Sequence, residues 1–154
     1  MTGFADTNWI VATYFIKRDA DRTGTVERFM RRHGQPLVIS HLVLLESLNV
    51  FAWTAKQKDS AEWVSFQADL GRKFLVDTMQ WDLVRQRMTE LCAAYSHRAK
   101  LGTLDLTLVA SALLTGAQIF LSFDSQCRAL AAAQRLKVFP ELNAQEKEML
   151  GTLR

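Results

Sequence analysis

The sequence predicts an α/β fold built around a short, mainly parallel central sheet. Short apolar segments alternate along the chain with longer segments whose apolar residues recur at helical spacing, a pattern typical of βαβ units. The chain has 154 residues, enough for one domain with its own core, and contains no internal repeat or flexible linker. We therefore predict one domain over residues 1–140 and a C-terminal tail over residues 141–154.

The first half of the chain is predicted to contain two strands, each followed by helices. The strands cover residues 3–5 and 37–40, where apolar residues are bounded by turn or helix signals. A helix over residues 20–33 has a clear end, because Gly34 can adopt the left-handed cap and Pro36 cannot continue the helix. The other predicted helices lie around residues 10–15, 41–58 and 61–74.

The second half continues the same alternation. Its predicted strands cover residues 76–79, 119–122 and 137–139. Its predicted helices cover residues 82–100, 104–115 and 125–136, and Gly102 and Gly116 mark helix ends. The segment from Glu141 is polar with helical character, and we place it outside the core.

Composition sets broad limits on the kind of protein. Cys92 and Cys127 are far apart and form no metal-binding or disulfide framework, so both are expected to pack as small apolar residues in a reducing compartment. No signal peptide and no membrane-spanning run is recognised, so a cytoplasmic location is expected. The pI of 9.1 reflects a mild excess of Lys and Arg, which is compatible with a polyanionic partner.

Four acidic residues lie where the chemistry of such a fold is usually found. In an open parallel sheet, ligands bind beyond the carboxyl ends of the strands. Asp6 ends the first strand, Asp124 follows the strand over residues 119–122, and Asp105 opens the helix that leads into that strand. Glu46 lies inside an almost wholly apolar helix, where an unpaired buried carboxylate would cost several kcal/mol.

A simpler explanation exists for each acid alone. Asp is a favoured helix cap, so Asp6, Asp105 and Asp124 could be capping residues, and Glu46 could lie at a partly exposed edge. Capping does not explain why acids mark successive strand–helix junctions. The sequence also lacks a Gly-rich phosphate loop, a zinc-binding Cys spacing and a Gly-x-Ser-x-Gly motif.

The acids together favour one kind of chemistry. A set of carboxylates alone selects hard divalent cations, Mg²⁺ or Mn²⁺. Such ions bind phosphate oxygens and lower the pKa of a bound water. The sequence therefore favours hydrolysis of phosphodiester bonds.

Four segments, in order, resemble the motifs of PIN-domain proteins. Residues 4–8 (FADTN) resemble the opening motif, in which a strand ends in Asp-x-Asn or Asp-x-Ser. Residues 40–46 (SHLVLLE) resemble the second motif, with its Glu in a helix, and residues 104–110 (LDLTLVA) resemble the third. Residues 120–124 (FLSFD) resemble the fourth, a strand followed by Ser/Thr-x-Asp. The resemblance extends over residues 4–139.

The size of the chain and its lack of accessory domains are most similar to VapC-type toxins of toxin–antitoxin pairs. The resemblance implies a three-layer α/β/α sandwich and a Mg²⁺- or Mn²⁺-dependent endoribonuclease that hydrolyses RNA. It also implies a homodimer that a cognate antitoxin protein inhibits. It assigns catalysis and metal binding to four residues and supporting polar roles to Asn8 and Ser122. The four are Asp6, Glu46, Asp105 and Asp124.

The chain departs from the toxin pattern at two positions. Many toxins carry a His three residues after the third acid, where this chain has Leu108. Some carry another acid directly after the fourth, where this chain has Ser125. Neither change touches the four acids, but the subfamily and the RNA target stay open.

Two secondary features have two interpretations each. His97, Arg98 and Lys100, just before Asp105, could bind the RNA backbone or could form a solvated helix end. A group of aromatic residues on two consecutive helices is expected to pack in the core, with an antitoxin or subunit interface as the alternative. These residues are Phe51, Trp53, Trp63 and Phe66.

Two other acid-based α/β folds do not fit these residues, and two other functions stay open. Haloacid-dehalogenase phosphatases need Asp-x-Asp after the first strand, whereas this chain has Asp6-Thr7-Asn8, and the order of acids does not match a response-regulator receiver. A PIN fold that binds RNA or protein without cleaving it stays open. A housekeeping RNA-processing nuclease stays open as well.

Overall fold

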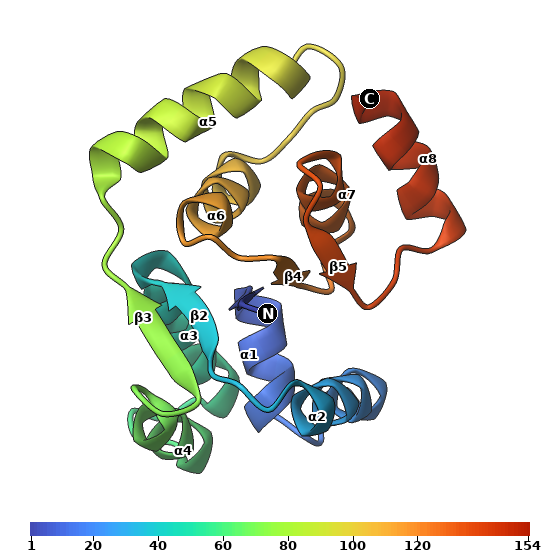
Figure 1. The fold of residues 1–154 in the computed structure, drawn as a ribbon. Helices are drawn as coiled ribbons and strands as arrows, with labels where there is room; N and C mark the ends of the chain where they lie inside the picture. Colours follow the sequence, from blue (N-terminus) through green and yellow to red (C-terminus); the bar gives the residue numbers. More distant parts are fainter.

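Five parallel strands form one sheet in the order β3-β2-β1-β4-β5 in the computed structural model, which describes residues 1–154 (Figure 1). This confirms the predicted mainly parallel sheet. The central strand β1 is buried along its whole length, because helices cover both of its faces. The strands are β1 (Gly3–Ala5), β2 (Leu37–Ser40), β3 (Phe74–Asp77), β4 (Ile119–Leu121) and β5 (Lys137–Phe139).

Eight helices cover the sheet in two layers. Helices α1–α4 lie on one side of it and α5–α8 on the other, so the fold is a three-layer α/β/α sandwich as expected (Figure 1). The helices are α1 (Thr7–Tyr14), α2 (Ala20–His33), α3 (His41–Ala55), α4 (Ala61–Asp69), α5 (Trp81–Tyr95), α6 (Thr103–Leu114), α7 (Ser125–Ala133) and α8 (Ala144–Leu153). None of them is both long and apolar enough to cross a membrane.

The order in which strands are added to the sheet reverses between β1 and β4, although all the strands are parallel. From β1 the sheet grows outward through β2 to β3, and the chain then returns to β4 and continues to β5. Right-handed crossovers place the helices of the two directions on opposite faces. Ala5 pairs with Leu121, so the carboxyl ends of β1 and β4 lie side by side. Such a reversal point is where open α/β sheets bind ligands.

Two predicted boundaries, on either side of the turn between α4 and β3, were wrong. The helix predicted over residues 61–74 ends at Asp69, and the strand predicted over 76–79 begins at Phe74. Gly71 adopts a φ of 79°, and the Asp69 carboxylate accepts hydrogen bonds from Tyr14, Arg72 and Lys73. These contacts, and the pairing of β3 with β2, stop the helix earlier than its apolar periodicity suggests.

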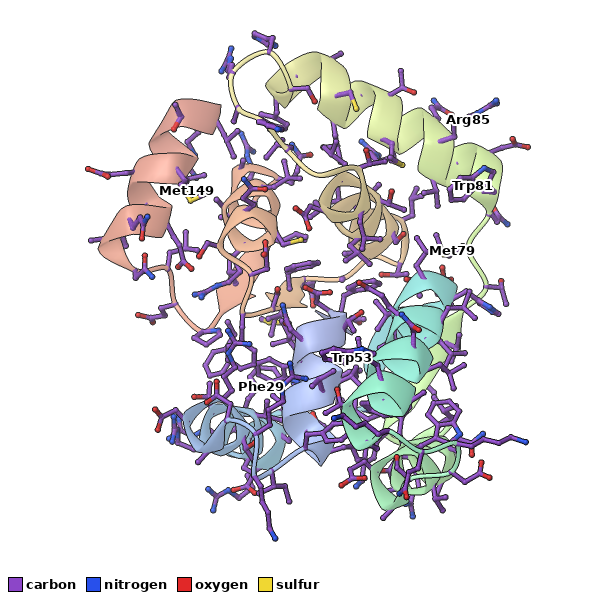
Figure 2. All side chains as sticks on the ribbon, turned by 180° about the vertical axis from the view of Figure 1, so that it is seen from behind. Phe29, Trp53, Met79, Trp81, Arg85 and Met149 are labelled. Carbon is purple, nitrogen blue, oxygen red and sulfur yellow. The ribbon has the colours of Figure 1, made fainter.

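Other differences concern burial and the ends of three helices. The helices predicted over residues 41–58, 82–100 and 125–136 end earlier, at Ala55, Tyr95 and Ala133. Phe51 and Phe66 are buried and Trp63 packs against the core, as expected, but Trp53 on α3 is 76 % exposed (Figure 2). Cys127 is buried, whereas Cys92 is exposed, contrary to expectation.

The segment after Glu141 has the expected helical character and is attached firmly to the sandwich. Helix α8 packs against α7 and buries Leu153. Glu146 is buried and forms an ion pair with Arg128 of α7 at 3.0 Å. Helix α8 therefore looks polar in the sequence, yet its Glu146 forms a buried contact with α7.

Candidate active site

All four predicted acids line one cleft of about 380 Å³, which we call the acidic cleft. It opens at the carboxyl ends of β1 and β4, where the order of the strands in the sheet reverses. Two of the acids follow these strands directly or within a few residues, and the other two come from α3 and α6 on opposite faces of the sheet. The tertiary structure thus brings together residues separated by up to 118 positions (124 − 6).

Asp6 is the most buried of the four acids. It follows β1 and caps α1, and its Oδ1 accepts a hydrogen bond of 2.6 Å from the backbone N–H of Thr7. Its Oδ2 accepts hydrogen bonds from the Ser122 hydroxyl at 2.7 Å and from the Asn8 amide at 3.2 Å. Burial raises the pKa of Asp6 to about 7; the charges of Glu46 and Asp124 add to the rise, and the hydrogen bonds oppose it.

Glu46 is connected to Asp6 through Thr7. The Thr7 hydroxyl donates a hydrogen bond of 2.5 Å to Oε2 of Glu46, while the Thr7 backbone N–H is bonded to Asp6. Glu46 is half-buried on α3, so one end of its carboxylate is fixed and the other can meet a ligand in the cleft. The sequence did not single out Thr7; its position between Asp6 and Asn8 in the first motif was the available signal.

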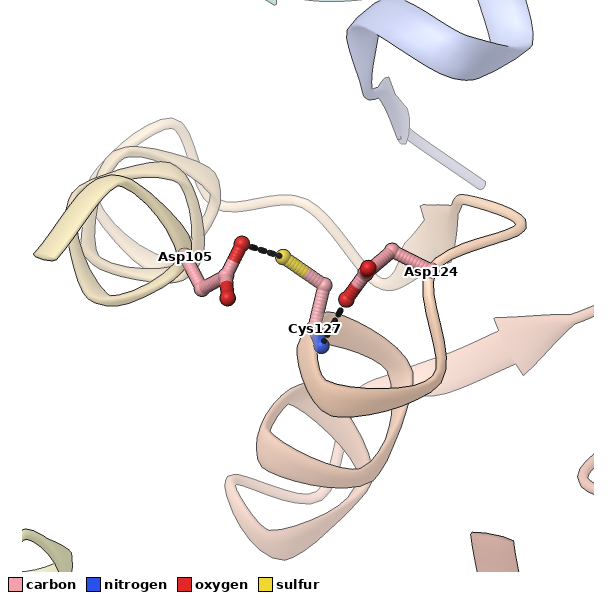
Figure 3. Close-up of side chains that lie close together, drawn as sticks. All are labelled: Asp105, Asp124 and Cys127. Atoms are coloured by element: carbon pink, nitrogen blue, oxygen red, sulfur yellow. Dashed lines mark hydrogen bonds between the residues drawn. The ribbon is translucent and has the colours of Figure 1, made fainter. Parts of the chain in front are cut away.

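Asp105 and Asp124 are connected by Cys127 (Figure 3). The exposed Asp124 caps α7 by accepting a hydrogen bond of 2.9 Å from the Cys127 N–H, and the Cys127 thiol lies 3.1 Å from Oδ1 of Asp105, to which it donates. One oxygen of each acid and the sulfur all lie within 4.8 Å of one another. Burial, together with the charge of Asp124, raises the pKa of Asp105.

Cys127 has a second role besides packing. Burial raises the pKa of its thiol, and the neighbouring carboxylates raise it further, so the thiol keeps its proton and acts as a donor to Asp105. This role was not predicted. The only signal in the sequence was that Cys127 stands three residues after Asp124, where the first turn of a helix faces its cap.

Asn8 and Ser122 lie behind the acids and join the two central strands. The Asn8 side chain accepts a hydrogen bond of 3.0 Å from the Phe123 N–H and donates to Ser122 at 3.3 Å. The Ser122 hydroxyl also accepts a hydrogen bond of 3.0 Å from the Asp124 N–H. These bonds fix the position of Asp6 relative to the loop that carries Asp124.

None of the four acids forms an ion pair with a basic residue. All six ion pairs in the structure involve other carboxylates. Asp6 and Asp124 do cap helices, but each uses only Oδ1 for its cap, and Asp105 caps none. Capping therefore explains part of their positions and does not neutralise their charge. A set of carboxylate oxygens without a cationic partner fits Mg²⁺ or Mn²⁺.

The basic residues at the acidic cleft differ from those singled out in the sequence. His97, Arg98 and Lys100 do not line the cleft, and Arg98 donates a hydrogen bond to the Leu153 carbonyl at the end of α8. Their proposed contact with RNA stays a prediction. Arg18 and Arg22 do line the cleft. Nothing in their spacing pointed to it, because the path of the chain between α1 and α2 is a tertiary feature.

Comparisons with known proteins agree with this geometry. The PIN-domain family model, described as "PIN domain", matches residues 4–133. No curated protein matches the chain. The structure is similar to that of VapC20 from Mycobacterium tuberculosis, which is described as a sarcin–ricin loop cleaving toxin, with a TM-score of 0.65 and 24% identity over 83% of this chain and 94% of the toxin. At this identity the likeness shows the fold, while the family match spans most of the chain: the protein belongs to the PIN-domain family.

Proposed function

We propose that this protein is a metal-dependent endoribonuclease that hydrolyses RNA phosphodiester bonds. The observation that supports this most strongly is the acidic cleft, which four carboxylates line without forming an ion pair with any basic side chain. Burial, with a smaller contribution from the charges of Glu46 and Asp124, raises the pKa of Asp6, so the ionised metal-free site is costly in free energy. Such an arrangement is expected where a bound cation completes the site.

Asp6, Glu46, Asp105 and Asp124 would hold Mg²⁺ or Mn²⁺, directly or through water. When bound, the ion supplies a Lewis acid that polarises the phosphate and lowers the pKa of a water. The remaining residues position the carboxylates. Thr7, Asn8 and Ser122 orient Asp6 and Glu46 by donating hydrogen bonds, and Cys127 does so for Asp105 while keeping its own proton.

The family match and the VapC20-like fold support a proposal for the biological setting. We propose that the chain is the toxin of a toxin–antitoxin pair, that it acts in the cytoplasm as a homodimer, and that a cognate antitoxin inhibits it. A housekeeping RNA-processing nuclease with the same cleft is the main alternative. A small neighbouring reading frame that encodes a DNA-binding partner would favour the toxin.

A second alternative is a PIN fold that binds RNA or protein without cleaving it. The presence of all four acids in one cleft argues against this alternative. Purified protein that binds a panel of tRNAs and rRNA fragments in Mg²⁺ or Mn²⁺ but never cuts them would support it and contradict the proposed activity.

The decisive variant is Asp124→Asn, which removes one charge and keeps an oxygen that can still accept the capping bond from Cys127. We expect it to abolish cleavage of single-stranded or loop RNA and to melt at the same or a higher temperature than the wild type in chelator. Mg²⁺ or Mn²⁺ at about 100 times its Kd should stabilise the wild type by about 2.7 kcal/mol and the variant less.

The matched control is Asp82→Asn, which changes a 92 % exposed acid on α5 outside the acidic cleft. This variant should cleave RNA and respond to metal as the wild type does. If Asp124→Asn also keeps its activity, and metal shifts the melting of all three proteins equally, Asp124 is only a helix cap and the proposed site is wrong.

A further inference from the structure

The acidic cleft has a second, basic part. Arg18 lies in the connection between α1 and α2, and Arg22 lies in the first turn of α2; both line the cleft together with the four acids. They are the only Lys or Arg residues that do so. Neither forms an ion pair with any of the four acids. Arg22 pairs instead with Asp19, which also lines the cleft, and Arg18 forms no ion pair.

Both arginines are held in place by neighbouring residues. The Arg22 guanidinium lies 5.0 Å from the centroid of the Phe123 ring, and its Nε lies 3.3 Å from the Asp19 carboxylate, which caps α2. Phe123 directly precedes Asp124, so Arg22 is tied to the loop that carries an acid of the site. Arg18 donates a hydrogen bond of 3.3 Å to the Thr54 hydroxyl at the end of α3.

These contacts leave most of the donors of each guanidinium free. A guanidinium has five N–H donors, and stacking on a ring leaves the donors in its plane available. The Arg22 side chain is 47 % exposed, and Arg18 is exposed as well. Arginine in this state suits bidentate contacts with phosphate, because its donors match the phosphate oxygens and less freedom is lost on binding.

A polyanion needs such a feature in order to enter this cleft. Four carboxylates alone repel RNA, and bound metal attracts only the phosphate that it contacts. Phosphates on either side of that one would still lie near acidic groups, unless a basic group receives them. Arg18 and Arg22 lie in the same cleft beside its apolar wall of Val11 and Phe15, which provides that position.

We propose that Arg18 and Arg22 form a binding site for the backbone phosphates of single-stranded RNA that flank the cleaved bond. The proposal rests on the proposed function for the identity of the ligand. Unlike Arg18 and Arg22, the basic residues His97, Arg98 and Lys100 lie after the end of α5 and outside the cleft. The site binds phosphate regardless of base sequence.

The test is the binding of a fluorescein-labelled single-stranded RNA, followed by anisotropy in EDTA so that the RNA stays uncut. Arg18→Ala and Arg22→Ala should each weaken binding several-fold at low salt. Each should also make the salt dependence of log K shallower by about 0.7, the value for one phosphate contact on a single strand. Arg22→Lys, which keeps the charge, should restore the slope and part of the affinity.

Lys17→Ala is the matched control, because Lys17 is exposed, adjacent in sequence and outside the cleft. Its affinity and slope should equal those of the wild type. In Mn²⁺, Arg22→Ala should raise KM with little change in kcat and should show the same thermal shift with metal as the wild type, because its metal site is intact.

Lys100→Ala is measured in the same way, because Lys100 lies outside the cleft. The proposal is wrong if both arginine variants keep the affinity and slope of the wild type, or if Lys17→Ala loses as much affinity as they do. It is also wrong if only Lys100→Ala loses affinity. The proposal and the function can fail separately. Arginine-dependent binding without any cleavage contradicts the nuclease and keeps the phosphate site. Metal-dependent cleavage by the wild type, together with normal RNA binding by both arginine variants, supports the nuclease and contradicts the phosphate site.

Discussion

Two groups of charged residues meet near the start of α7: the acidic cleft and the junction between α7 and α8. They differ in whether a basic side chain pairs with the buried carboxylate. In the α7–α8 junction, Glu146 is 1 % exposed and its oxygens accept hydrogen bonds from Arg128, Ser125 and the Asn143 N–H. In the acidic cleft, Asp6 is 5 % exposed and accepts hydrogen bonds only from neutral donors, while the charges that raise its pKa are those of Glu46 and Asp124. The chain neutralises the first carboxylate itself and gives the second no basic partner.

The two groups are neighbours in sequence, which makes the contrast informative. Asp124 belongs to the acidic cleft, and Ser125 belongs to the α7–α8 junction. Adjacent positions thus carry a carboxylate that lines the cleft and a hydroxyl that bonds to Glu146. Asp6 and Glu146 are both buried, and the difference between them is that only Glu146 has a basic partner.

The largest effect on stability is expected at the α7–α8 junction. Arg128→Met removes the partner of Glu146 and leaves a buried charge without compensation, so the free energy of unfolding should fall by about 3–5 kcal/mol. Arg128 also donates to the carbonyls of Pro140 and Glu141, and these bonds are lost too. Urea unfolding in chelator measures the change.

Arg85→Met serves as the matched control for that experiment, since Arg85 on α5 pairs with Asp82 at the surface (Figure 2). It should change the free energy of unfolding by about 0.5 kcal/mol or less. Equal effects of the two substitutions would mean that the buried pair has no special structural role.

A somewhat smaller effect on the free energy of unfolding is expected from a change of pH, through the ionisation of Asp6 in the acidic cleft. The pKa of Asp6 is about 7 in the folded protein, above the ordinary value of 3.8 for Asp, so the folded chain keeps a proton that the unfolded chain has released. The contribution of Asp6 to stability in chelator should therefore be greatest below about pH 4 and should decline up to about pH 7. The loss from Asp6 is at most about 4 kcal/mol, at 1.36 kcal/mol per unit of pKa.

The measurement compares wild type with Asp6→Asn by urea unfolding between about pH 4 and pH 8. The variant cannot titrate at this position, so its stability should decline less over that range, and added Mg²⁺ should reduce the decline of the wild type. Parallel pH profiles for the two proteins in chelator would show that Asp6 is ionised at little cost and would remove the contrast between the two groups.

The smallest effect is expected at the contact between Thr7 and Glu46. Thr7→Val keeps the shape of the side chain and removes the hydroxyl that donates to Glu46, so stability in chelator should fall by about 1–2 kcal/mol. Metal affinity should fall as well, because Glu46 is no longer oriented. Isothermal titration with Mn²⁺ checks this; unchanged affinity would show that Thr7 contributes to folding alone.

The local elements and the identity of the four acids could be predicted from the sequence. Helix α2 has the predicted bounds, because Gly34, with a φ of 64°, ends it locally. Asp6 and Asp124 were identifiable because parallel strands place the residues that follow them at one edge of the sheet. Glu46 was identifiable as an acid within an apolar helix, and Asp105 as an acid at a helix start. Periodicity and turn chemistry are local properties, so they can be read from neighbouring residues.

The tertiary structure decided what each side chain contacts. Gly71 and the bonds to Asp69 end α4 before its apolar pattern does. Cys127 donates to Asp105, and Glu146 is buried against Arg128, although neither pairing has a signature in the sequence. Arg18 and Arg22 line the acidic cleft while His97 and Lys100 do not, because crossovers between distant strands set which helix ends meet. Contacts of this kind depend on how whole layers pack, and no local pattern of residues encodes them.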